Sequence, residues 1–190
     1  MLIIGTTTTT VEHYKDAAER HLQVCSILFK QLDYRQNFRD INKYQNILAE
    51  LYYLSGYVVE CAINYTYLIH KGFNDSDNYN QSHHPTIRPC WDARVRLKGH
   101  FRFTGSNTPS CEEILAQLPS NLLPDYLKNL GNVIRIGLVG QDIIREKMQR
   151  HWDPSVRYAF ESTGLVYTNA TADEIKLYYK AAKSLYNDLI

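Results

Sequence analysis

The stretch AELYYLSGYVVECAINYTYLIH, residues 49–70, decides how this 190-residue chain folds. Its apolar side chains recur at steps of three and four residues: Leu51, Leu54, Val58, Cys61, Ala62, Tyr65 and Leu68. That spacing puts them on one face of an α-helix, so the stretch predicts a helix with a stripe that faces the core. Two glutamates, an asparagine and five tyrosines within it argue against a helix that spans a lipid bilayer.

A second face of the same stretch combines tyrosines with polar groups: Tyr53, Tyr57, Glu60, Asn64 and Tyr67. We expect both faces to be covered, which would leave the Glu60 carboxylate in a low-dielectric interior. A buried carboxylate needs a cation or a strong hydrogen-bond donor, because alone it costs several kcal/mol or becomes protonated. The partner of Glu60 is therefore the question that the rest of the sequence has to answer.

Two other segments begin with a capping box, in which a threonine and a glutamate three residues later bond each other's backbone. These boxes are Thr9 with Glu12 and Thr171 with Glu174. Residues 11–32 and 171–189 then show amphipathic periodicity, so we predict a helix over each. The first of these should lie antiparallel to the organising helix, whose start we place near Ile41.

Residues 124–150 also show helical periodicity and predict one helix. Pro124 suits its first turn, and three glycines, Gly131, Gly137 and Gly140, weaken it and allow a bend. Pro154 pushes the residue before it away from helical geometry, so the helix should stop near His151 or Trp152.

Two stretches between residues 72 and 103 lack the helical periodicity of the segments described above. Residues 72–81 are polar, without apolar periodicity, and predict a solvated loop. Residues 94–103 then alternate strictly between basic and apolar side chains, a period of two that predicts a short β segment.

The basic side chains of this β segment are candidates for nucleic-acid binding: Arg94, Arg96, Lys98 and Arg102. A one-sided basic row could follow a phosphate backbone, and Trp91 nearby could stack on a base. The alternative is that the charges only protect an exposed edge strand from aggregation. The sequence leaves both interpretations open.

Length and composition predict a single domain over residues 1–190. The net charge of +1 gives no general attraction to nucleic acid or acidic membranes, so such binding needs a local patch. Four cysteines without a CxxC pair favour reduced thiols and a cytoplasmic location. We expect no secretion signal, no membrane span, no cofactor and no metal site, since His83, His84 and Cys90 lack a second ligand pair.

The residues AERH at 18–21 and YYLSGYVVECAI at 52–63 resemble the HEPN domain (higher eukaryote and prokaryote nucleotide-binding). The resemblance covers the first two helices and the last third of the chain, and it is strongest at GYVVEC, residues 56–61. It implies a mostly α fold, an antiparallel four-to-five-helix bundle into which residues 72–110 are inserted. It also implies a homodimer, association with RNA or a nucleotide, and a nucleotidyltransferase or antitoxin partner in a prokaryotic defence or toxin–antitoxin system.

Many HEPN domains are metal-independent endoribonucleases with an arginine and a histidine four to six residues apart, and Arg145 and His151 match that spacing. By this resemblance His151 would handle the proton of the attacking 2′-hydroxyl while Arg145 holds the phosphate. Six residues of regular helix turn by about 600°, so the side chains converge only if the helix unwinds before His151. Glu146, where the family usually has a small polar residue, would compete with phosphate for Arg145.

The segment from Trp152 to Tyr158 resembles a Trp-x4-Arg-Tyr pattern of HEPN branches that lack the nuclease pair. The sequence therefore favours a non-catalytic accessory or partner-binding module, with a toxin-type endoribonuclease as the alternative. Glu60, with Arg157 and Tyr158, would form buried support. Two roles stay open for Glu60: an ion pair with Arg157 or Arg145 that locks the helices together, or the orientation of Arg145 at a phosphate site.

Overall fold

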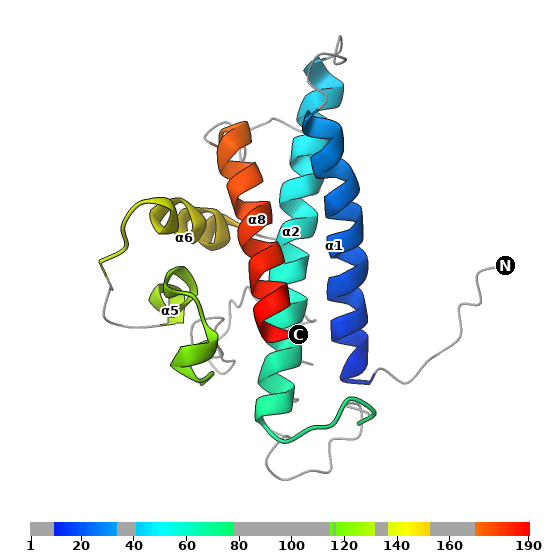
Figure 1. Ribbon diagram of the computed structural model, residues 1–190, viewed down its shortest axis with the longest axis vertical. Helices are drawn as coiled ribbons and strands as arrows, with labels where there is room; N and C mark the ends of the chain where they lie inside the picture. The colour runs from blue at the N-terminus through cyan, green and yellow to red at the C-terminus, as the bar shows by residue number, and fades with distance from the viewer. Residues whose placement is uncertain (1–9, 34–40, 78–114, 116, 132–136, 153–169) are drawn as a thin grey trace, which may run out of the picture.

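The computed structural model describes residues 10–33, 41–77, 115, 117–131, 137–152 and 170–190, and these residues are mostly helical (Figure 1). Five α-helices lie in this part of the chain: α1 (Glu12–Asp33), α2 (Ile41–His70), α5 (Asp125–Gly131), α6 (Gln141–His151) and α8 (Ala172–Leu189). A 3₁₀ turn, η2 (Ser120–Leu122), precedes α5. The predicted mostly α fold is therefore confirmed, while the predicted β segment at 94–103 lies outside the described residues.

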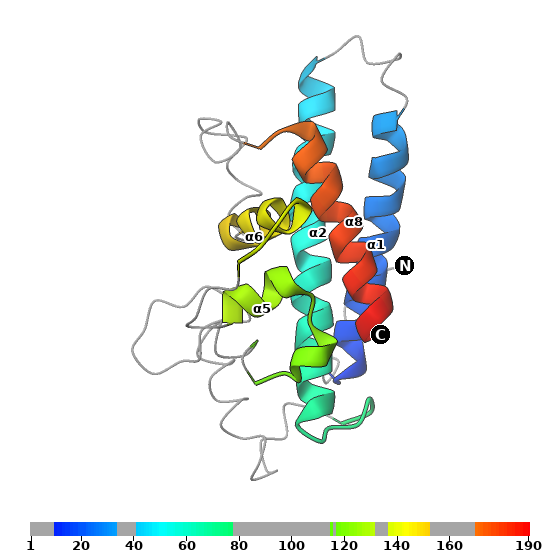
Figure 2. The same cartoon turned by 60° about the vertical axis from the view of Figure 1, so that its left-hand side comes forward.

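Three long helices run side by side along the molecule: α2 lies between α1 and α8 in the view of Figure 1, and α8 crosses in front of the other two in Figure 2. α2 runs antiparallel to α1, as the sequence predicts, and α8 runs in the same direction as α2. α6 lies crosswise to them and packs against α8, and α5 packs against α6. Two short helices thus flank one side of a layer of three long ones.

α2 is enclosed on more than one face, as its sequence predicts. Two consecutive residues, Val58 and Val59, are both fully buried, although they point about 100° apart on the helix. Its buried serine and threonine hydroxyls bond within the helix: Ser55 Oγ donates to the Leu51 carbonyl at 2.6 Å, and Thr66 Oγ1 donates to the Ala62 carbonyl at 2.9 Å. These local bonds satisfy the hydroxyls inside the core without another helix.

The turn after α2 joins the end of that helix to the start of α1. The backbone N–H groups of Val11 and Glu12 donate to the carbonyls of Asp77 and Asp75 at 3.1 and 3.0 Å. These bonds satisfy donors that the first turn of a helix cannot pair internally. Residues 72–77 form no regular element, in agreement with the predicted loop, and Thr9 of the predicted capping box lies outside the described residues.

The helix predicted over 124–150 is wrong in one respect, because the structure contains two helices there. α5 ends at Gly131, residues 137–140 are not helical, and α6 begins at Gln141. Gly140, before the first residue of α6, has φ of +58°, a conformation that other residues rarely adopt. Gly131 therefore ends α5 and Gly140 precedes α6, so these glycines separate two helices rather than bend one, and the predicted stop near His151 or Trp152 is confirmed.

The predicted capping box of α8 is present in full. The Thr171 side chain accepts from the Glu174 backbone N–H at 3.2 Å, and Glu174 Oε2 accepts from the Thr171 backbone N–H at 2.7 Å. The helix buries the predicted apolar face, which includes Ile175, Tyr178, Tyr179, Ala182 and Leu185. None of the described helices has a stretch apolar and long enough to cross a membrane.

Candidate functional site

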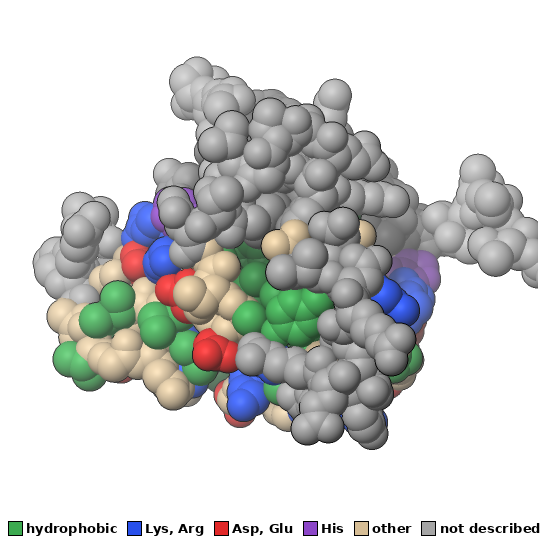
Figure 3. Space-filling model, turned by 90° about the horizontal axis from the view of Figure 1, so that it is seen from above, with side chains coloured by type: hydrophobic (Ala, Val, Ile, Leu, Met, Phe, Trp, Pro, Cys, Tyr) green, Lys and Arg blue, Asp and Glu red, His purple; other side chains and the backbone are tan. Residues whose placement is uncertain are grey.

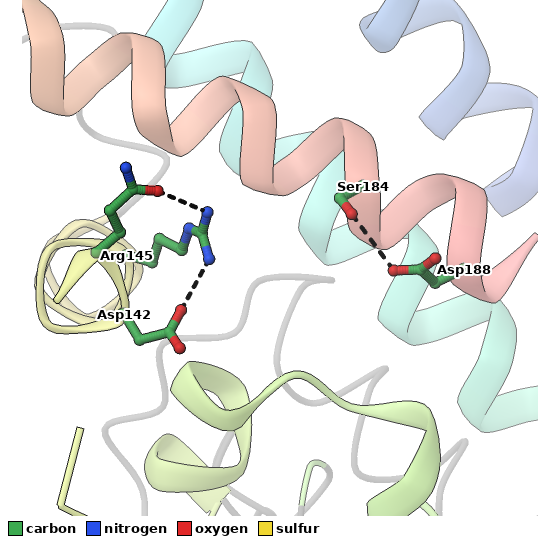
Figure 4. Close-up of polar contacts among 5 residues, drawn as sticks. Asp142, Arg145, Ser184 and Asp188 are labelled. Carbon is green, nitrogen blue, oxygen red and sulfur yellow. Dashed lines mark hydrogen bonds and ion pairs between the residues drawn. The ribbon is translucent and has the colours of Figure 1, made fainter. Parts of the chain in front are cut away.

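α6 carries both residues of the predicted catalytic pair, and it holds Arg145 with side chains from its own first turns. Arg145 Nη1 donates to Asp142 Oδ1 at 2.9 Å, and Nη2 donates to Gln141 Oε1 at 3.1 Å (Figure 4). The spacings of three and four residues bring these side chains to one face of the helix. The guanidinium therefore has a carboxylate partner before any ligand arrives.

His151 leaves α6 in a different direction from Arg145. The helix continues without interruption to His151, where the backbone becomes extended at Trp152. Six residues of regular helix separate the two side chains by about 120° of rotation. The unwinding that would bring them together is therefore absent within α6, and His151 lies exposed at the end of the helix.

Glu146 does not approach Arg145, although the sequence suggests it as a competitor for that cation. It accepts from Arg150 Nε at 2.9 Å and also bonds Arg150 Nη2. The Asn129 amide of α5 donates to the same carboxylate at 3.5 Å. The anion that occupies Arg145 is instead Asp142, and the sequence signal for it is the three-residue spacing.

Polar contacts near the end of α6 fix this helix to α2 and α8. Tyr52 of α2 donates its hydroxyl proton to the Met148 carbonyl at 2.7 Å. Tyr178 of α8 donates to Gln149 Oε1 at 2.6 Å in a buried site, and Lys147 pairs with Glu174 across 3.1 Å. These contacts tie α6 to the bundle, and Gln149 lies on the same face of the helix as Arg145, four residues earlier.

Trp152, just after α6, packs against the middle of α2. Its indole Nε1 donates to the Tyr53 carbonyl at 3.1 Å, and its ring lies directly over Gly56. A Cβ atom at position 56 would overlap the indole, far closer than two non-bonded carbon atoms approach each other. Position 56 therefore has to be glycine, because Trp152, almost one hundred residues later in the sequence, packs directly against its backbone.

Next to Trp152, an aromatic cluster joins α1 to α2. The Tyr57 ring meets Trp152 edge-on at 5.2 Å and Tyr53 at 4.9 Å between centroids, and it stacks on His21 at 5.4 Å. Burial lowers the pKa of His21, and the neighbouring Arg20 cation lowers this pKa further. Burial also raises the pKa of Tyr57, with smaller contributions from Tyr53 and the Glu60 carboxylate. The cluster therefore favours a neutral imidazole and a protonated phenol.

Glu60 is buried, as the sequence predicts, with 4% of its surface exposed. Arg145, one of the two predicted partners, bonds Asp142 and Gln141 and not Glu60, so this alternative is wrong. The other predicted partner, Arg157, lies outside the described residues, as does Tyr158. Because the Arg145 side chain bonds other residues of α6, an ion pair with Arg157 stays the prediction for Glu60.

Two enclosed polar atoms lie at the junction of α5, α6 and α8. The Tyr126 hydroxyl and Arg145 Nε have no hydrogen-bond partner in this described part of the chain. Burial raises the pKa of Tyr126, and the Arg145 cation opposes that rise. Figure 4 shows Arg145 directed from α6 towards the space beside α8, where Ser184 and Asp188 lie. The inner part of the guanidinium is therefore directed into the protein rather than towards solvent.

The remaining candidate residues cannot be placed. Arg94, Arg96, Lys98 and Arg102 fall outside the described ranges, and so do His83, His84 and Cys90. In the ranges that are described, no three His, Cys, Asp or Glu side chains gather as metal ligands would. Cys25 and Cys61 are buried and form no disulfide in the described part of the chain, and burial raises the pKa of Cys25 to about 12. The Cys25 thiol is therefore not suited to act as a nucleophile near neutral pH.

Comparison with protein-family models, with curated proteins and with solved structures finds no match.

Proposed function

We propose that this chain is a non-catalytic HEPN-like module of the cytoplasm. It would associate with RNA or a nucleotide and with a protein partner, a nucleotidyltransferase or antitoxin, in a prokaryotic defence or toxin–antitoxin system. The helical bundle and the sequence resemblance at residues 52–63 support the family assignment. The choice of a non-catalytic role depends on Arg145.

Arg145 carries the proposal because its guanidinium is already bound. Both terminal nitrogens donate to side chains of α6, one of them the Asp142 carboxylate. A phosphate that used the same donors would have to displace that carboxylate or lie beside it, and like charges at such short range repel. A preorganised phosphate site offers free donors, whereas this arrangement offers donors that are in use.

The direction of His151 supports the same conclusion. A general base must come within hydrogen-bond reach of the proton that it removes while the phosphate is held by the arginine. The uninterrupted helix between the two residues keeps their side chains about 120° apart. Within one copy of the chain, Arg145 and His151 therefore cannot contact one scissile phosphate without a change in α6.

The first experiment tests for nuclease activity. A pool of single-stranded and structured RNA is incubated with wild type, Arg145→Ala and His151→Ala in the presence of EDTA. Arg150→Ala is the matched control, since it removes an exposed arginine of the same helix that pairs with Glu146. We expect all four proteins to leave the RNA intact. Cleavage that is lost in Arg145→Ala and His151→Ala but kept in Arg150→Ala would replace this proposal with the endoribonuclease.

The second experiment tests the binding role, which we assign to the basic residues Arg94, Arg96, Lys98 and Arg102. Fluorescence anisotropy of a labelled single-stranded RNA measures Kd over a range of salt concentrations. A variant with Arg94→Glu and Arg96→Glu should bind about tenfold or more weakly and show a flatter salt dependence. The double variant Lys180→Glu with Lys183→Glu, at two exposed lysines of α8, is the control for net charge. Equal losses in both proteins, or no binding by wild type, would contradict the RNA-binding role.

A further inference from the structure

The junction of α5, α6 and α8 holds two buried hydrogen-bond donors, the Tyr126 hydroxyl and Arg145 Nε–H, that bond nothing in the described part of the chain. Tyr126 of α5 is 1% exposed, so its hydroxyl has lost the bonds to water that it makes in the unfolded chain. A buried donor without an acceptor costs free energy, and such a group in a native protein calls for an explanation. Packing does not supply one, because a phenylalanine would fill almost the same volume.

An acceptor lies at the outer edge of the same junction. In the part of the chain that the structure describes, the Asp142 carboxylate uses only Oδ1, which accepts from Arg145 Nη1 at 2.9 Å. Figure 4 shows its other oxygen on the side of α5, the helix that carries Tyr126. Burial raises the pKa of Tyr126 most, the Arg145 cation lowers it, and the Asp142 and Asp188 carboxylates raise it further. The hydroxyl therefore lies within the field of all three charged groups.

The charges around the two donors favour an uncharged ligand. Arg145 contributes one positive charge, whereas Asp142 and Asp188 contribute two negative ones, so an anion such as phosphate would be repelled. The guanidinium already binds one uncharged amide of the chain itself, because Gln141 Oε1 accepts from Arg145 Nη2 at 3.1 Å. The side chains of Arg145 and Asp142 are 30% and 31% exposed, which marks the side from which a small molecule enters.

We propose that this junction binds the primary carboxamide of a small uncharged molecule. The carbonyl oxygen has two lone pairs, which accept from the Tyr126 hydroxyl and from Arg145 Nε–H, and the amide nitrogen donates to Asp142 Oδ2. A carboxylate of the same shape has no proton to donate and faces Asp142 with a like charge. An amidinium has no acceptor for the two donors. The inference depends on these three side chains and not on the proposed function.

The first test uses three probes of the same shape: acetamide, acetate and acetamidinium. Each is titrated into isotope-labelled protein, and NMR follows the Arg145 Nε–H resonance, which is assigned by its loss in Arg145→Lys. Acetamide should shift this resonance in a saturable way with a millimolar Kd, as expected for so small a ligand. Acetate and acetamidinium should bind about tenfold or more weakly, because each leaves buried polar groups unpaired. No saturable shift with acetamide, or similar affinity for all three probes, would overturn the proposal.

The second test separates binding from stability. Tyr126→Phe removes only the hydroxyl, so the Kd for acetamide should rise about tenfold. The urea midpoint of this variant should not fall, because the hydroxyl has no protein partner to lose. Tyr186→Phe makes the same change on the side of α8 near Asp16 and Glu19 of α1, and it should keep the wild-type Kd. A lower midpoint with an unchanged Kd in Tyr126→Phe would show a structural role and overturn the proposal.

The third test concerns the contact with Asp142. Asp142→Asn keeps an oxygen that can accept from Arg145 and removes the negative charge that repels acetate. The ratio of the Kd for acetate to the Kd for acetamide should therefore fall about tenfold relative to wild type. An unchanged ratio would contradict the contact. None of these measurements involves RNA, so failure here is distinct from failure of the proposed function.

Discussion

α2 and α6 are stabilised in different ways: α2 by its buried side chains, and α6 by a few polar contacts with neighbouring helices. α2 is long, its apolar residues are buried on adjacent faces, and its buried Ser55 and Thr66 hydroxyls bond within the helix. α6 is short, buries only Met148 and Gln149, and leaves Ile143 more than half exposed. Its position depends on a few polar ties to Tyr52, Tyr178 and Glu174.

The exposed side of α6 also carries hydrophobic side chains. Seen from above, hydrophobic side chains are open to view on the left, the side on which α5 and α6 lie in Figure 1 (Figure 3). Val139 and Ile143 are the exposed large hydrophobic residues of this region. A helix held by a few polar bonds should respond to single substitutions differently from a helix held by its core, and the following variants test that difference.

The largest effect should come from truncation inside α2. Leu51→Ala removes a side chain with no exposed surface, and the loss of buried contacts plus the cavity should cost about 2 to 5 kcal/mol of unfolding free energy. Ile143→Ala in α6 removes a mostly exposed side chain and should change stability by less than about 0.5 kcal/mol. Urea unfolding followed by circular dichroism measures both. Similar losses in the two variants would mean that α6 is as much a part of the core as α2.

The second variant acts at the point where the two regions meet. Gly56→Ala places a methyl group inside the volume of the Trp152 indole, so Trp152 must move, at a cost of about 1 to 3 kcal/mol. The greater helix propensity of alanine offsets part of that loss. Gly137→Ala is the control, because a Cβ there meets no atom within 4 Å. Urea unfolding, with Trp fluorescence as a second signal, gives the unfolding free energy of both variants. The difference between them separates the steric effect at position 56 from the general effect of replacing a glycine. An unchanged Gly56→Ala would show that Trp152 is not held against α2.

The third variant removes one polar tie of α6. Tyr178→Phe deletes the buried hydroxyl that donates to Gln149, and the acceptor left without it should cost about 1 to 3 kcal/mol. Tyr65→Phe deletes a hydroxyl with a similar bond, to Asp75, but at an exposed site, so its effect should be smaller. Hydrogen exchange in α6 should rise in Tyr178→Phe more than exchange in α2. An equal rise in both helices would show that α6 does not open independently of the bundle.

Features that depend on neighbouring residues in sequence are the ones that the sequence predicts well. The burial of α2 follows from the continuous spacing between Leu51 and Leu68, and the start of α8 follows from the pair of Thr171 and Glu174. The predicted burial of Glu60 is confirmed for the same reason, since its helix has apolar residues on both sides. Each of these signals lies within a few turns of one helix.

Features that depend on distant segments could not be predicted. Nothing in the local pattern shows that Trp152 covers Gly56, because the contact joins the end of α6 to the middle of α2. The anion at Arg145 is an exception, because spacing alone could have identified it. Asp142 lies three residues before Arg145 on the same face of α6, whereas Glu146 is its neighbour in sequence and points in another direction. Whether a glycine bends a helix or separates two helices, as Gly140 does before α6, is decided by the backbone conformation and not by composition.

The smallest expected effect concerns pH at the contact of α1 with α2. The pKa of His21 is lower in the folded chain than its ordinary value of 6.5, so between these two values the unfolded chain binds more protons. Stability should therefore fall as the pH drops from about 7.5 to about 5.5, and His21→Gln should lose less over that range. Arg20→Gln should lie between the two, because removing the cation brings the pKa of His21 closer to its ordinary value. Urea midpoints at the two pH values give the comparison. Equal pH dependence in wild type and His21→Gln would mean that the imidazole in the Tyr57 cluster is no harder to protonate than in the unfolded chain.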